Sequence, residues 1–124
     1  MADSSLPYHF KDSEIIDTEQ FEDMRELLEE DFSELIEVYF IDSKQRIASL
    51  YSALENNDNV AGFEAAHALK GASANLGAIQ LISLSEQLQA ACCAQKIDHS
   101  RLIIEALPIA LKDIENEIKQ RLNN

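Results

Sequence analysis

A histidine, a lysine and a glycine at helical spacing are the residues of this chain best suited to chemistry. They are His67, Lys70 and Gly71, in the run from Ala66 to Gly77. Residues three and four apart share a helix face, because each residue turns the helix by about 100°. The stretch therefore predicts an imidazole nucleophile, a cation one turn away that can hold an anionic group, and a neighbour with no side chain to obstruct a large partner.

Helical periodicity divides this stretch into two faces. Residues within about 60° of His67 form one face, and small or apolar residues suited to a core lie opposite. We therefore expect His67 to point outward. A glycine in a helix interior costs about 1 kcal/mol relative to alanine, so Gly71 beside His67 indicates close approach of a partner. The first face holds Val60, Phe63, Glu64, Lys70, Gly71 and Ala74, and the second holds Gly62, Ala65, Ala66, Leu69, Ser73 and Leu76.

The pattern His-x-Leu-Lys-Gly-x-Ser-x-x-Leu-Gly resembles the phosphoacceptor motif of histidine-containing phosphotransfer (HPt) domains. The stretch from Asp17 to Leu54 is also similar to the first two helices of stand-alone bacterial members. The resemblance therefore covers roughly residues 15 to 123, nearly the whole chain. The matched positions are His67, Leu69, Lys70, Gly71, Ser73, Leu76 and Gly77.

This resemblance implies that His67 carries a phosphoryl group between aspartates of receiver domains, one in a hybrid sensor histidine kinase and one in a response regulator. A neutral imidazole is nucleophilic without a base to activate it. Lys70 would stabilise the phosphoryl charge, and Gly71 would give the partner steric access. The receiver domain would bring the acidic pocket and Mg²⁺, so we expect no cofactor and no metal on this chain. It would be a phosphorelay intermediate and not an enzyme with kinase activity of its own.

The apolar neighbours of His67 predict a docking surface for the receiver domain. Glu64, one turn before His67, either orients the ring or is a solvated acid. The first helix would extend this surface if it packs beside the helix of His67. The predicted docking residues are Val60, Phe63, Glu64, Ala74, Met24 and Leu28. Ser73 lies on the core side, and we expect its hydroxyl to bond back to a backbone carbonyl.

Composition narrows the class of partner. The chain has 124 residues, with 23 acidic and 10 basic side chains and a formal net charge of -13. Such acidity disfavours nucleic acid, which requires clustered Lys and Arg, and an anionic membrane surface. Partners are therefore expected to be proteins, and the chain itself a monomer. No apolar run approaches the ~18 residues of a spanning helix, and Met1 to Asp12 lacks an apolar signal core, so we expect a cytoplasmic protein.

Periodic apolar residues predict an all-α fold, an antiparallel up-down-up-down four-helix bundle with a short additional N-terminal helix. Residues 1–16 would be a tail and 17–124 the phosphotransfer domain. The expected helices begin at Asp17 or Thr18 and then span about 31–56, 59–76 and 79–96, with the last one from residue 98 onward. Asp17 and Gln20 predict a capping box, and Asp98 an N-cap. Pro108 is expected to kink or split the last helix.

Three other interpretations compete with phosphotransfer. A helical module could bind receiver domains without carrying phosphate, and a purely structural bundle would leave the apolar residues near His67 without a role. A cofactor-binding bundle needs Glu-x-x-His on two helices, and only Glu64 to His67 has that spacing. His9 and His99 are expected to be solvated, and the adjacent Cys92 and Cys93 to be small apolar helix residues and not a disulfide or metal pair.

Overall fold

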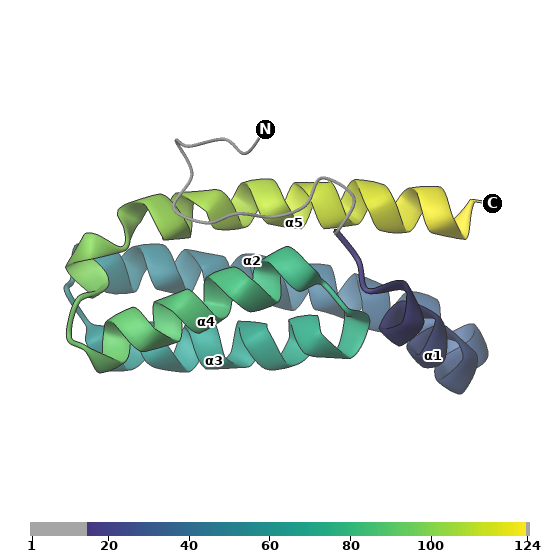
Figure 1. Ribbon diagram of the computed structural model, residues 1–124, viewed down its shortest axis with the longest axis horizontal. Coiled ribbons are helices and arrows are strands. Elements are labelled where there is room, and N and C mark those ends of the chain that lie inside the picture. The colour runs from purple at the N-terminus through teal and green to yellow at the C-terminus, as the bar shows by residue number, and fades with distance from the viewer. Residues whose placement is uncertain (1–14, 124) are drawn as a thin grey trace.

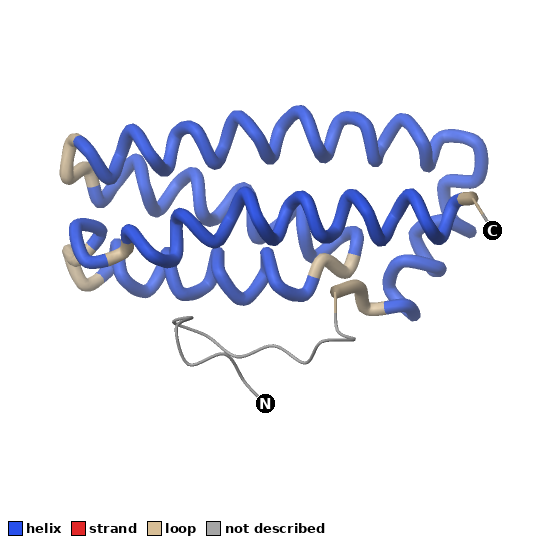
Figure 2. Tube along the Cα trace, turned by 90° about the horizontal axis from the view of Figure 1, so that it is seen from above, coloured by secondary structure: helices blue, strands red, loops and turns tan. Residues whose placement is uncertain are grey.

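The computed structural model describes residues 15–123, and its α-helices pack into one bundle (Figure 1). Helices α2 to α5 run antiparallel in succession, and α1 lies at the end of the bundle where α3 ends and α4 begins (Figures 1 and 2). The expected all-α antiparallel bundle with a short N-terminal helix is confirmed. The elements are α1 (Thr18–Leu28), η1 (Glu29–Asp31), α2 (Phe32–Glu55), α3 (Asn59–Leu76), α4 (Ile79–Cys93), η2 (Ile97–His99) and α5 (Arg101–Leu122).

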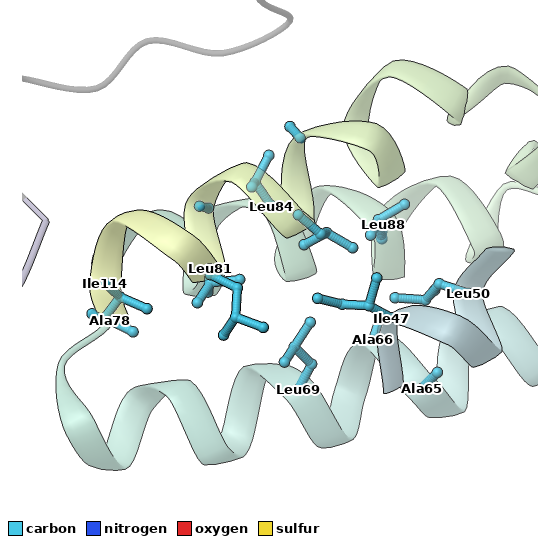
Figure 3. Close-up of a cluster of buried hydrophobic side chains, with 14 of the residues drawn as sticks. Ile47, Leu50, Ala65, Ala66, Leu69, Ala78, Leu81, Leu84, Leu88 and Ile114 are labelled. Atoms are coloured by element: carbon cyan, nitrogen blue, oxygen red, sulfur yellow. The ribbon is translucent and has the colours of Figure 1, made fainter. Parts of the chain in front are cut away.

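The core lies between the four long helices. Figure 3 shows Leu69 of α3 facing Leu81 and Leu84 of α4, with Ile47 of α2 beside them. Burying such apolar side chains is the main favourable contribution to folding. The buried face of α3 is the one expected from helical periodicity, which leaves the opposite face for function. Its buried residues are Gly62, Ala65, Ala66, Leu69, Ser73 and Leu76.

The turn between α3 and α4 is pinned by the segment that precedes α1. Gly77 has φ +76°, a left-handed conformation that glycine adopts without a steric penalty. Its carbonyl accepts a hydrogen bond of 2.8 Å from the Asp17 amide, and Ile16 pairs with Ala78 in an isolated antiparallel bridge. The expected Gly77 cap is therefore confirmed, and residues 16 and 17 belong to the packed structure.

Half of the expected capping box of α1 forms. The Asp17 carboxylate accepts from the Gln20 amide at 3.3 Å. The Gln20 side chain does not reach back to the cap, because its amide nitrogen donates to the Asn75 carbonyl of α3 at 3.0 Å. That bond fastens α1 to the end of α3. Leu27 of α1 is 76% exposed.

Pro108 does not split the last helix. α5 is one helix from Arg101 to Leu122, with Pro108 inside it on the exposed side. Proline removes one backbone donor from the helix. Buried residues on both sides of it hold the two halves against the same core: Ile104, Leu107, Leu111 and Ile114.

The expected N-cap at Asp98 is wrong. Residues Ile97–His99 form a 3₁₀ turn, and α5 begins only at Arg101. Ile97 is fully buried, and its amide donates to the Asn59 side chain at 3.0 Å. Burial of Ile97 therefore determines the path of this connection, and α4 accordingly ends at Cys93, three residues before the expected Lys96.

Candidate functional site

His67 lies exposed in the middle of α3, on the face opposite the core. Its Nδ1 is 3.1 Å from the side-chain amide nitrogen of Gln89 in α4. The ring of Phe63 stacks on the imidazole, with 6.1 Å between centroids and an interplanar angle of 8°. Across residues 15–123 no hydrogen bond involves Nε2. The ring is therefore held at one edge and along one side, and Nε2 is the nitrogen that a partner can reach.

Lys70 lies one turn after His67 and is paired across the helix interface. Its Nζ is 3.9 Å from a carboxylate oxygen of Glu86 in α4, and the two side chains are 41% and 57% exposed. An ion pair this open to water is weak, about 0.2–1 kcal/mol. Lys70 is thus only weakly held by Glu86 and can exchange this carboxylate for another anion.

Gly71 is not required by the packing of this chain. A Cβ built on Gly71 meets no atom within 4 Å. The same atom on Gly62 would lie 2.5 Å from Cδ1 of Ile97 and 2.9 Å from Sγ of Cys92, so Gly62 is a packing glycine. The open space at Gly71 lies outside the bundle, on the side of His67.

Ser73 is structural, but its hydrogen-bond partner is not the expected backbone carbonyl. Its hydroxyl is 2.8 Å from the hydroxyl of Tyr39 in α2, and both side chains are buried. Burial raises the pKa of Tyr39 to about 12, against the opposite effect of its bond to Ser73. This buried pair ties α2 to α3 beneath the face that carries His67.

The predicted docking residues fall into two groups. Four of them share the outer face of α3: Val60 is 68% exposed, Glu64 and Ala74 are exposed, and Phe63 is half-buried against His67. Met24 and Leu28 of α1 are half-buried and pack against the core. α1 contacts the end of α3 near Asn75, about 12 Å along the helix from His67.

A hollow of about 230 Å³ lies between α3 and α4 beside this face. Val60, Phe63 and Glu64 line it together with Cys92 and Cys93. Cys93 is exposed, whereas Cys92 is buried, and its burial raises the pKa of the Cys92 thiol. The hollow is open and shallow, which suits an inserted side chain of a protein partner better than an enclosed small molecule.

The described part of the chain has few other side chains that could serve as a nucleophile or a metal ligand. His99 is exposed, with Nε2 3.8 Å from the neighbouring Asp98, and His9 lies outside the described residues. No group of three His, Cys, Asp or Glu side chains within residues 15–123 is arranged to hold a metal ion. Within the same range, no helix combines the length and the apolarity that crossing a membrane requires.

Gln89 and Glu86 are the site residues that sequence reasoning missed. They lie three residues apart on α4, as His67 and Lys70 do on α3, and the antiparallel order pairs each with its partner. A partial signal for them was present. A short turn at Gly77 implies an antiparallel hairpin that puts the middle of α4 opposite His67, but counting outward from Gly77 gives Gln87 and does not single out Gln89.

A family model described as the Hpt domain matches residues 34–119 of this chain. This range includes His67 and Lys70 and the two α4 residues that contact them. The chain belongs to the Hpt family. Members of this family are phosphocarriers of phosphorelay systems that interact with receiver domains, and they are not kinases.

The fold comparison agrees with this assignment. The crystal structure of histidine-containing phosphotransfer protein B (HptB) from Pseudomonas aeruginosa PAO1 superposes with a TM-score of 0.83. The match has 25% sequence identity and covers 88% of this chain and 95% of that one. Among curated protein sequences none matches this chain significantly.

Proposed function

We propose that this Hpt protein relays a phosphoryl group between aspartates of receiver domains through Nε2 of His67. One observation carries the proposal: an exposed imidazole is held through Nδ1 by Gln89, which leaves Nε2 without a hydrogen-bond partner among residues 15–123, and Lys70 follows one helical turn later. The open space at Gly71 lies on the same side. HptB, which shares the fold, is itself named a phosphotransfer protein.

The tautomer of His67 decides which nitrogen can attack. When the Gln89 amide nitrogen donates to Nδ1, the neutral ring carries its proton on Nε2. Rotating the Gln89 carboxamide by half a turn places its oxygen at Nδ1 instead. That arrangement stabilises the Nδ1–H tautomer and frees the lone pair of Nε2.

In the proposed step, the Nε2 lone pair attacks the phosphorus of an aspartyl phosphate on the receiver domain. The N–P bond forms while the P–O bond breaks, and the aspartate leaves as a carboxylate. The ring keeps its Nδ1 proton, which the Gln89 oxygen accepts in a hydrogen bond. The reverse step on a second receiver domain returns His67 to its starting state.

Lys70 and the receiver domain each contribute to stabilising the charge of the transferred phosphoryl group. Phosphoryl transfer depends mainly on positioning and on stabilising charge on the oxygens. Lys70 is the cation nearest in sequence to His67 and supplies part of that charge from this chain. Mg²⁺ and an acidic pocket are proposed to come with the receiver domain, which would dock on Val60, Phe63, Glu64 and Ala74, with Met24 and Leu28 at the margin.

The test is transfer of label from a panel of phosphorylated receiver domains to this chain. We expect a mass increase of one phosphoryl group that is lost in acid, present in His99→Gln and absent in His67→Gln. Undiminished labelling of His67→Gln would contradict the assignment. A receiver domain that binds the chain without transferring label would favour the alternative, a module that binds receiver domains and carries no phosphate.

A further inference from the structure

Two side-chain contacts connect α3 with α4 at the site, and we call each of them a rung. His67 contacts Gln89, and one turn further on Lys70 contacts Glu86. The first rung holds the ring. The second joins two opposite charges on the surface, one of which is the cation proposed to stabilise the phosphoryl group. Glu86 is therefore paired with the same Lys70 cation that would stabilise the phosphoryl group.

A phosphoryl group on Nε2 would change the balance of charge at this rung. It brings up to two negative charges into a surface where Glu64 and Glu86 are already exposed. The Lys70 ammonium carries a single positive charge, which the phosphoryl oxygens would have to share with the Glu86 carboxylate 3.9 Å away. Phosphoryl oxygens and the Glu86 carboxylate thus compete for the same cation.

We propose that Glu86 is a positioning residue that acts through Lys70 and shortens the life of the phosphohistidine. In the resting protein it holds Lys70 at the α4 side. After phosphorylation it continues to draw Lys70 away from the phosphoryl oxygens. As a result, the phosphoryl group leaves His67 for a receiver domain sooner and does not accumulate on this chain. This inference rests on the proposed function of His67.

The exposure of the pair sets the size of the effect. Both side chains are near half-exposed, so water and salt screen their attraction. The range for such pairs, about 0.2–1 kcal/mol, corresponds to about a 1.4- to fivefold change in an equilibrium or a rate. That is enough to alter how the phosphoryl group is divided between His67 and a receiver aspartate.

The experiment compares Glu86→Gln with Glu115→Gln. Glu115 pairs with Lys112 at 3.4 Å on α5, so its variant removes the same charge from another lysine pair. Both proteins are labelled to equilibrium with one phosphorylated receiver domain, and the decay of isolated labelled protein is then followed. We expect Glu86→Gln to raise the labelled fraction and the half-life about 1.4- to fivefold at low salt. The increase in both values should be smaller at high salt. Glu86→Asp keeps the charge and should have a labelled fraction and a half-life close to those of the unaltered chain. Glu115→Gln should leave both values unchanged.

Lys70→Ala separates action through Lys70 from direct repulsion. In a Lys70→Ala background, Glu86→Gln should have no further effect. A half-life unchanged or shortened by Glu86→Gln would overturn the proposal, and so would an undiminished gain in the Lys70→Ala background. Failure of the unaltered chain to take label at His67 would instead overturn the proposed function. A merely structural role for Glu86 would lower labelling together with the urea midpoint, opposite to the expected rise.

Discussion

Gly62 and Gly71 lie on opposite faces of α3, and the packing of the chain requires only Gly62. A Cβ on Gly62 would enter the space of buried Ile97 and Cys92, whereas a Cβ on Gly71 meets nothing within 4 Å. Glycine lowers the stability of a helix interior. Gly71 is thus a local weakness with no compensating contact inside the molecule, which is the arrangement expected where a partner comes close.

This contrast predicts opposite effects on folding. Gly71→Ala should stabilise the chain by about 1 kcal/mol, and Gly62→Ala should destabilise it by about 1–3 kcal/mol through overpacking. Gly71→Gln should fold normally yet block transfer, because its side chain would stand beside His67. Urea unfolding and a transfer assay measure the two effects separately. Normal transfer by Gly71→Gln would show that no partner approaches there.

The contact between Gln89 and His67 predicts a positioning effect on transfer. Gln89→Leu removes the hydrogen bond at Nδ1 and leaves the ring held only by its stack on Phe63. Since a hydrogen bond contributes about 0.5–1.5 kcal/mol, transfer should slow by about two- to tenfold. ¹⁵N NMR of the imidazole should show a shifted tautomer ratio in the same variant. Unchanged rate and unchanged tautomer ratio together would remove Gln89 from the mechanism.

The buried Tyr39 hydroxyl predicts a loss of stability in alkaline solution. Its pKa is raised from 10.0 to about 12, so the folded protein keeps the phenol proton at a pH where the unfolded chain releases it. The corresponding stability is present below pH 10 and is lost as the pH rises toward 12, and it amounts to about 2–3 kcal/mol.

Urea unfolding at pH 8, 10 and 11.5 measures this dependence. Tyr39→Phe has no phenol proton to lose, so its stability should fall less over the same interval. At pH 8 the variant should be less stable by about 1 kcal/mol, because the Ser73 hydroxyl loses its buried partner. Parallel pH profiles of the two proteins would rule out Tyr39 as the cause.

The acidity of the chain predicts that docking does not depend on long-range attraction. The receiver domain is proposed to bring an acidic phosphorylation pocket, and this chain has a net charge of -13. Burial of apolar surface, about 25 cal/mol per Å², would then supply the affinity. Added salt should leave the affinity unchanged or raise it slightly through screening. Phe63→Ala should weaken binding of the unphosphorylated protein more than Lys70→Ala does, and titrations at two salt concentrations would show this. A steep loss of affinity with salt would instead demonstrate electrostatic steering.

The helical repeat in the sequence determined which face of α3 is buried. The six buried residues of α3 and the outward position of His67 follow from spacing along one helix, and the left-handed turn at Gly77 follows from its missing side chain. These are local properties, because each depends on residues within a few positions of one another.

Tertiary structure decided the contacts between helices. Gln89 and Glu86 come to face His67 and Lys70, and Tyr39 meets Ser73, only once the helices have settled at one relative height and rotation. Core packing sets that arrangement. It also outweighs the helix-breaking tendency of Pro108, because α5 continues through this residue. Helical periodicity specifies a face, but the partner on the next helix depends on how buried side chains from several helices fit together.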